Sequence, residues 1–162
     1  FEQVALGLPD ATGETLDKLL ADNRLKNFEG DTEYHVGTDD QSAEAHALSW
    51  LHMNCGVTCH NDVQSSKGYS TGLRMRLEPA ELDGSPLTEV AVRKTGVNVA
   101  AKTIRWVGQT RIVPGSAADS LLYTLMTQRG DKAQQMPPLA TFLVDQENGE
   151  WVKTWIDELP KP

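Results

Sequence analysis

The residues best suited to chemistry lie in one short stretch, Trp50 to His60, with the sequence Trp-Leu-His-Met-Asn-Cys-Gly-Val-Thr-Cys-His. It contains both cysteines of the chain, Cys55 and Cys59, and a histidine directly follows the second. Two thiols at the ends of a tight turn can add to the two vinyl groups of a haem, and the adjacent imidazole can bind the iron. This order is typical of c-type haem attachment, although three residues separate the cysteines instead of two.

Three other interpretations of this stretch stay open at this stage. In an oxidising compartment, Cys55 and Cys59 can close a small disulfide. A zinc site built from Cys55, Cys59, His60 and His52 has acceptable ligand types, but the sequence lacks a second segment with paired ligands. A thioredoxin-like redox pair needs two residues between its cysteines and a βαβ context, and neither is present.

Length, composition and charge limit the class of protein. The chain has 162 residues, of which 39% are hydrophobic, and no apolar run approaches the roughly 20 residues that a membrane span needs. This predicts a soluble globular chain with one domain and an extension. Its formal net charge of -8 disfavours nucleic acid as a partner, because phosphate binding requires positive counter-charge. A basic protein partner fits this charge better, and nothing in the sequence specifies the oligomeric state.

A helix is predicted to lead directly into Cys55. Thr38 and Gln41 match a capping box at its start, in which each side chain satisfies a backbone donor. Its apolar face comprises Ala43, Ala47, Trp50 and Leu51. The small alanines would allow another helix to approach closely, and His46 and His52 are expected at the surface or boundary of this helix.

The C-terminal helix is the expected partner of that helix. Asp145 is a good N-cap, Pro160 stops the helix, and Trp151 and Trp155 lie on one face that must be buried. Shorter helices are predicted over residues 15–25 and 86–93, and after the capping pattern at Ser116 up to Gly130. Residues 73–77 alternate as a strand would, and residues 104–107 and 111–113 are its candidate antiparallel partners.

Met136 precedes two prolines, a context that can hold a thioether in a set direction. Each proline restricts its own φ and the conformation of the residue before it. A core methionine before an ordinary proline turn is the alternative interpretation. Four basic residues are candidates for pairing with haem propionates, or else lie on solvated surfaces: Arg74, Arg76, Arg105 and Arg111.

Several separated segments together resemble the class I cytochrome c family, in its bacterial monohaem form. The segments are Cys55–His60, Arg111–Ser116, Ser120–Tyr123, Gln135–Leu139 and the final tryptophan-containing helix. The resemblance covers about residues 41–159 and implies a mainly α, cytochrome c-like helical domain with a small β element inserted after the attachment motif. Residues 1–40 would then be an N-terminal extension and residues 41–162 the haem domain.

The resemblance also implies the roles of individual residues. Cys55 and Cys59 would form the thioether links to one haem c, with His60 as the proximal and Met136 as the distal iron ligand. The extra residue between the cysteines is expected to bulge outward, with Gly56 supplying backbone freedom.

Ligation of the iron on both faces implies an electron carrier and not an enzyme, exported to the periplasm or the cell surface and meeting a redox partner protein. Two rival functions remain. One is a zinc- or disulfide-stapled interaction module without a redox role. The other is a haem enzyme domain in which the distal position is open.

Overall fold

The structure is a computed structural model that describes residues 16–25, 35–39, 41–82, 86–130, 134–138 and 141–161. The chain divides into two compact units, residues 1–35 and 36–162. The described part of the first unit contains α2 (Leu16–Ala21), which is shorter than the helix predicted over residues 15–25.

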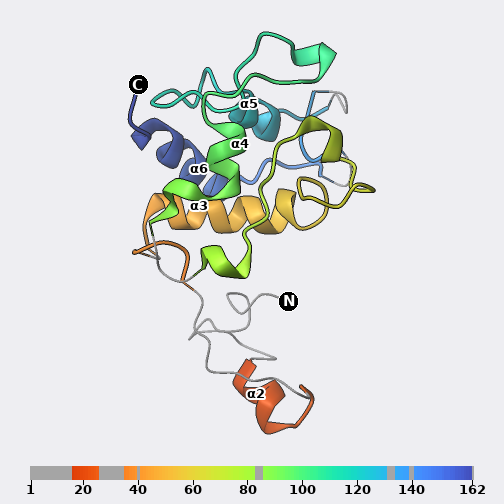
Figure 1. Ribbon diagram of the computed structural model, residues 1–162, viewed down its shortest axis with the longest axis vertical. Coiled ribbons are helices and arrows are strands. Elements are labelled where there is room, and N and C mark those ends of the chain that lie inside the picture. The colour runs from red at the N-terminus through yellow and green to blue at the C-terminus, as the bar shows by residue number, and fades with distance from the viewer. Residues whose placement is uncertain are drawn as a thin grey trace. The chain divides into compact units, whose positions relative to one another are not determined.

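The described part of the chain is mainly helical and has almost no strand, which agrees with the predicted α class. The helices of the second unit are α3 (Ala43–Leu51), α4 (Ala91–Gly96), α5 (Leu121–Thr127) and α6 (Gln146–Glu158) (Figure 1). Short helical turns lie between them: η1 (His52–Gly56), η2 (Tyr69–Thr71), η3 (Pro79–Glu81), η4 (Leu87–Glu89) and η5 (Ile104–Trp106). Among the described helices, none has the length and apolar character required to cross a membrane.

The helix before the cysteines begins later than the sequence predicts. Ser42 is its N-cap, and the Ser42 hydroxyl accepts a hydrogen bond from the Ala45 amide at 3.1 Å. The Gln41 amide instead donates to the Asp39 carboxylate at 3.0 Å, so Gln41 lies in the turn before the helix. The predicted capping box from Thr38 to Gln41 is therefore wrong, because the serine next to the first helical residue satisfies the free amide.

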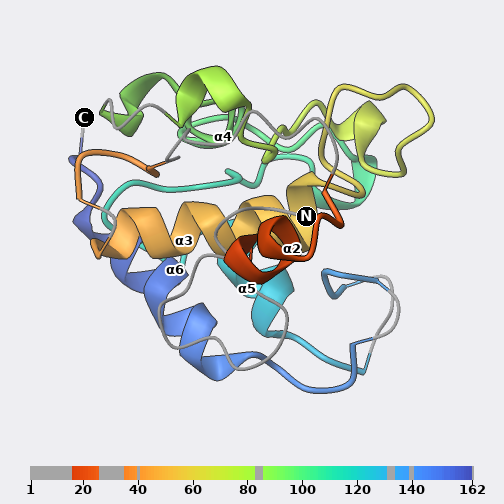
Figure 2. The same cartoon turned by 90° about the horizontal axis from the view of Figure 1, so that it is seen from below.

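α3 and α6 pack side by side and form the centre of the core, as the sequence predicts (Figures 1 and 2). Trp155 is 2% exposed, and its indole N–H donates to the Glu44 carboxylate at 3.2 Å. Trp151 is 36% exposed and stacks on His46 with ring centroids 4.6 Å apart, so only one of the two tryptophans is buried. The most buried members of the core are Ala45, Ala47, Leu48, Leu51, Met75, Val92, Ile112, Ala117, Val152, Trp155 and Ile156.

The predicted β element does not appear as a sheet in the described residues. They contain three isolated bridges, which join Val97 to Ile112, Ala100 to Thr110 and Val113 to Ser116. Residues 73–78 are extended without a neighbouring strand, and Ile104–Trp106 is a helical turn. The amides of Leu73, Arg74, Met75 and Leu77 are bonded elsewhere, and this removes their need for strand partners.

Candidate functional site

The cysteine-containing segment continues α3 in a wider helical turn. After Leu51 the backbone winds as a π-helix over His52–Gly56. The Val57 amide donates to the His52 carbonyl at 2.9 Å, and the His60 amide donates to the Cys55 carbonyl at 2.8 Å, each bond spanning five residues. A π-turn takes in more residues than an α-turn. The third residue between the cysteines is thus accommodated by winding and not by the outward bulge that the sequence suggests.

Both thiols lie on this turn and are free. Cys55 packs against the main core and Cys59 is half-buried. Burial raises the pKa of Cys55 to about 12, and the nearby Cys59 adds to this shift, so Cys55 is a protonated thiol at neutral pH. The turn therefore presents two free thiols four residues apart along one helical path, and residues with this spacing share a helix face.

Gly56 serves close packing and not backbone freedom. It is buried, and a Cβ at this position would lie 2.5 Å from the Arg76 amide nitrogen and 2.6 Å from the Met75 carbonyl carbon. The Met75 amide donates to the His60 carbonyl at 2.8 Å, and the Leu77 amide donates to the His52 Nδ1 at 2.7 Å. Met75 and Leu77 thus use their amides on the cysteine segment, and Leu73 and Arg74 use theirs on the Thr71 and Thr95 hydroxyls. These four amides are therefore not free for strand pairing.

His60 is held in one orientation by the loop that follows it. Its Nδ1 lies 3.4 Å from the Thr71 hydroxyl, which donates its own proton to the Gly68 carbonyl at 2.6 Å. Because that proton points to the Gly68 carbonyl, the hydroxyl can accept from His60 in the tautomer that carries its hydrogen on Nδ1. Nε2 then bears the lone pair that an iron or zinc ion would need.

The electrostatic surroundings of His60 favour its neutral form. Burial lowers its pKa, and the positive charges of Arg74 and Arg111 add to this effect, while a hydrogen bond with the Leu73 backbone opposes it. Gly68 packs so closely that a Cβ there would lie 2.8 Å from Nδ1. The imidazole is consequently neutral and tightly enclosed at neutral pH, as a metal ligand must be.

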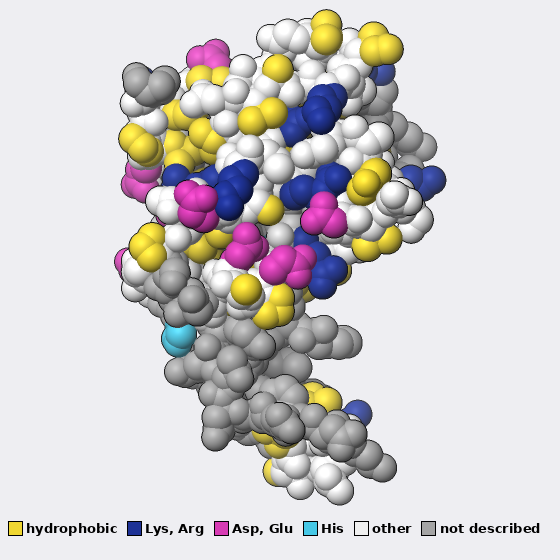
Figure 3. Space-filling view, viewed as in Figure 1, with side chains coloured by type: hydrophobic (Ala, Val, Ile, Leu, Met, Phe, Trp, Pro, Cys, Tyr) yellow, Lys and Arg dark blue, Asp and Glu magenta, His cyan; other side chains and the backbone are white. Residues whose placement is uncertain are grey.

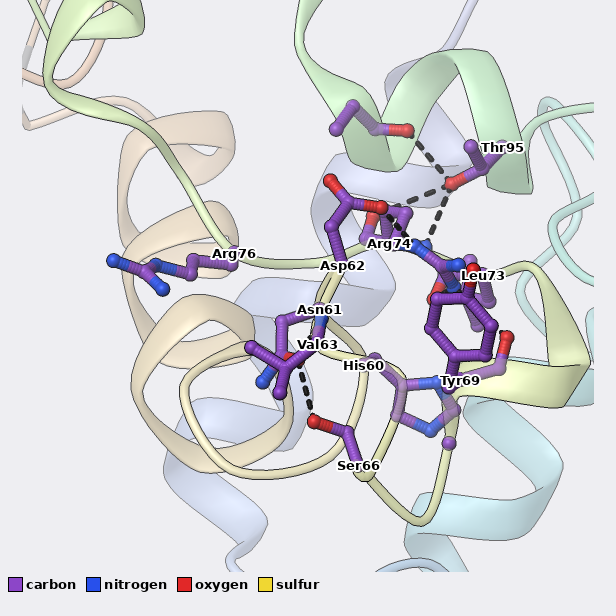
Figure 4. Close-up of polar contacts among 12 residues, drawn as sticks. His60, Asn61, Asp62, Val63, Ser66, Tyr69, Leu73, Arg74, Arg76 and Thr95 are labelled. Carbon is purple, nitrogen blue, oxygen red and sulfur yellow. Dashed lines mark hydrogen bonds and ion pairs between the residues drawn. The ribbon is translucent and has the colours of Figure 1, made fainter.

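The four arginines considered as propionate partners fall into two groups. Arg76 and Arg105 are exposed and lie on the surface. Arg74 bonds to Asp62 at 2.5 Å and lies over the Tyr69 ring, 4.8 Å from its centroid (Figure 4). Arg111 is 4% exposed and donates to the Thr71 and Thr95 carbonyls. The described contacts of Arg111 include no carboxylate, so it is a buried cation held only by neutral groups.

The methionines differ clearly in their surroundings. Met75 and Met126 belong to the main core, and Met53 is 45% exposed. Met136 is half-buried and packs with Trp106 against a separate second cluster, formed by Ala101, Leu121 and Leu125. Of the four, Met136 alone is neither exposed nor part of the main core. No described contact joins it to His60.

The loop that carries Met136 is fastened by backbone and polar contacts. The Met136 amide donates to the Leu125 carbonyl at 2.8 Å, which ties it to α5. Gln135 is 6% exposed, and its amide group donates to the Pro137 carbonyl at 3.1 Å and to the Thr141 carbonyl at 3.2 Å. The position of the thioether thus depends on a buried glutamine as well as on the following prolines.

The zinc interpretation finds little support in the described residues. They contain no group of three or more His, Cys, Asp or Glu side chains placed to hold a metal ion. His52 is 3% exposed, so its predicted place at the surface or boundary is wrong. Its Nδ1 accepts the Leu77 amide, and it therefore supports the fold of the cysteine turn.

A cavity of about 290 Å³ opens at the start of α3, lined by residues within 37–44 and 86–88 together with Glu158. None of the candidate cysteine, histidine or methionine residues lines it. One of its carboxylates, Glu44, is already bonded to Arg93 and Trp155. This cavity is therefore separate from the candidate site.

Sequence reasoning missed the residues that support His60 and the cysteine turn. They are Asn61, Gly68 and Thr71, all in the loop after the motif. A weak signal was present, because Asn-Asp directly after His60 and several glycines predict tight turns there. Which groups those turns would contact depends on the tertiary fold.

Comparisons with family models, with curated proteins and with solved structures find no match for this chain. Its function is therefore inferred from these residues and their geometry.

Proposed function

We propose that residues 41–162 form a cytochrome c-like domain that carries one haem c and transfers single electrons. Cys55 and Cys59 would hold the haem covalently, and His60 and Met136 would bind its iron. The observation that carries this proposal is the turn over residues 55–60, where two free thiols precede a neutral and oriented imidazole.

The chemistry of the donor groups fits haem c. Addition of a cysteine to a vinyl group requires a free thiol, and both thiols are free. Iron ligation requires a neutral imidazole whose second nitrogen is bonded, and His60 meets both conditions. Arg111 adds a buried cation that no described carboxylate neutralises, and a haem propionate would supply the missing negative charge.

Each residue has a defined task in this proposal. Haem iron, when bound, supplies one-electron chemistry. His60 is held by Thr71 so that Nε2 faces away from that hydroxyl. Met136 offers a soft thioether, which favours the ferrous state and raises the reduction potential. With a side chain on each face, the site leaves no position for a substrate, so an electron carrier fits better than an enzyme.

The partner and location follow from the same proposal. Covalent haem attachment implies assembly outside the cytoplasm, so the domain would work in the periplasm or at the cell surface. The chain has 23 acidic and 15 basic residues, a balance that attracts a basic redox partner over long range. The face in Figure 3 carries both signs of charge close together, so this attraction comes from the net charge and not from that face.

The decisive experiment is a visible absorption spectrum of the protein, oxidised and reduced, after production in a host that attaches haem c. We expect a Soret band and sharp reduced bands that stay with the polypeptide after denaturation and acid-acetone extraction. The Cys55→Ser/Cys59→Ser variant should lose the extraction-resistant colour. A colourless wild-type protein would refute the proposal and direct attention to a disulfide or zinc module.

The distal ligand needs its own test. In Met136→Ala, we expect the weak ferric absorption near the red end of the spectrum to disappear and the reduction potential to fall. Cyanide should then bind without displacing a side chain. Met53→Ala is the matched control, because Met53 lies close to Cys55 in sequence but is exposed. An unchanged band in Met136→Ala would exclude Met136 and assign the band to another methionine, whereas absence of the band already in wild type would favour a haem enzyme with an open distal site.

A further inference from the structure

Asn61, the residue directly after His60, makes a complete set of hydrogen bonds in a buried position. It is 4% exposed. Its amide nitrogen donates to the Gly56 carbonyl at 3.1 Å and to the Val57 carbonyl at 2.9 Å. Its amide oxygen accepts from the Val63 backbone amide at 3.0 Å and from the Ser66 hydroxyl at 2.5 Å (Figure 4). Both N–H donors and the oxygen acceptor of the carboxamide are thus in use.

The orientation of this side chain follows from its neighbours. The Val63 N–H is a donor and can be met only by the carboxamide oxygen. The two carbonyls on the opposite side are acceptors and can be met only by the nitrogen. Among residues of this size, only asparagine offers two donors on one side and an acceptor on the other.

The two carbonyls belong to the residues between the cysteines, Gly56 and Val57. The π-helix ends at Gly56, so the carbonyls of Gly56 and Val57 in this last turn lose helical partners and need others. The side chain of Asn61 provides them. It joins the turn that bears both thiols to the loop over residues 61–66, which lies next to His60.

We infer that Asn61 is a positioning residue for haem attachment, which holds the three-residue spacer so that Cys55 and Cys59 can both react. This inference rests on the proposed function and adds a requirement to it. A spacer with an extra residue has more ways to arrange its backbone, and the wrong ones move one thiol away from its vinyl group. Asn61 restricts the spacer to the π-turn seen here and thereby offsets the additional residue.

The test compares full-length variants produced with haem attachment in the same host. Asn61→Asp is isosteric and keeps acceptors toward Val63 and Ser66, but it places a second oxygen against the two spacer carbonyls. Asn54→Asp is the matched control. Asn54 lies in the same segment and also donates to a helical carbonyl, that of Trp50 at 3.0 Å, but it is exposed.

The readouts are the intact mass after alkylation, which counts free thiols, and the position of the reduced α-band, which reports an unreacted vinyl group. We expect Asn61→Asp to lower the ratio of doubly to singly linked protein by about tenfold, because one buried hydrogen bond is commonly worth that factor. Asn54→Asp should match wild type. If Asn61→Asp is doubly linked to the wild-type extent, the inference is wrong while the proposed function stands.

A second pair of variants distinguishes a positioning role of Asn61 from a general contribution of Asn61 to stability. Deletion of Thr58 shortens the spacer to the usual two residues, and Asn61→Asp is added to that shortened chain. We expect the aspartate to reduce double linkage much less there than in the full-length chain. An equal reduction in both chains would show a purely structural role. Absence of covalent haem in wild type would refute the proposed function itself, which is a different result.

Discussion

The two sides of the proposed haem site are built in different ways. The His60 side is tied to the main core by backbone and side-chain hydrogen bonds, such as those from Met75 and Leu77. The Met136 side rests on a small cluster of three buried residues, with Trp106 as a further neighbour. A side whose polar groups are already paired keeps its geometry by itself, whereas a small apolar cluster depends on what else packs against it. The first side should therefore be preformed, and the second should become ordered when the haem is bound.

The largest expected effect is a loss of unfolding free energy, and it is compared between one leucine from each region. Leu48→Ala removes a side chain that is 1% exposed in the main core, and we expect it to cost about 4 kcal/mol of unfolding free energy. Leu125→Ala removes one from the second cluster, and we expect about 2 kcal/mol because this small cluster can collapse more easily. Urea unfolding measures both. Only Leu125→Ala should also weaken the red-end ferric band, and a loss of that band in Leu48→Ala would contradict the comparison.

The next effect tests the close packing under the cysteine turn. Gly56→Ala forces a Cβ to within 2.5 Å of the Arg76 backbone, and we expect it to destabilise the protein by about 3 kcal/mol. Gly149→Ala is the matched control, because its Cβ would have no neighbour within 4 Å in α6. That change should stabilise the helix by about 0.5 to 1 kcal/mol. Similar unfolding midpoints for the two variants would show that residues 73–77 are not pressed against the turn.

A smaller effect is expected from the loop that carries Met136. Gln135→Leu removes the donor to the Pro137 and Thr141 carbonyls and should cost about 1 to 2 kcal/mol. Because this loop depends on few contacts, the red-end ferric band should disappear on warming at a temperature well below unfolding. Gln128→Leu, at an exposed position nearby, should behave like wild type. If wild type, Gln135→Leu and Gln128→Leu lose the band at the same temperature, Gln135 does not hold Met136 in place.

The smallest effect concerns Asp145, which joins α6 to α3 within the main core. It caps α6 and accepts the Trp50 indole N–H of α3 at 3.0 Å. Asp145→Ala should cost about 1 kcal/mol at neutral pH. Burial alone would raise the pKa of Asp145, but hydrogen bonds from Asn148 and Trp50 outweigh it and lower the pKa below 3.8.

A carboxyl group whose pKa is lower in the folded state stabilises the fold at pH values above its pKa in the unfolded state. This stabilisation is lost as the pH falls through the folded-state pKa. Urea midpoints of wild type should therefore approach those of Asp145→Ala as the pH drops below 3.8. A difference between the two proteins that stays constant down to strongly acidic pH would exclude this contribution.

The local parts of the fold were predictable because they depend on neighbouring residues. Asp145 caps the last helix as predicted, and that helix packs on α3 because both present an apolar face. The start of α3 was misplaced by a few residues, because Ser42 and not Thr38 supplies the cap, through its bond with the Ala45 amide. The strand over residues 73–77 failed for a different reason: the amides of Met75 and Leu77 find partners in the cysteine segment, which is far away in sequence.

The sequence alone determined the candidate attachment motif and the order of the candidate ligands, because these depend on residue types and short spacings. Only the tertiary structure decided how the third spacer residue is accommodated, since a bulge and a π-turn have the same sequence. Contacts from Asn61 and from residues 73–77 select the π-turn. The tertiary structure also separated Met136 from the core methionines, and it oriented His60 through a hydroxyl whose proton is used elsewhere. Hydrogen-bond partners and burial arise from segments that meet only in the folded chain.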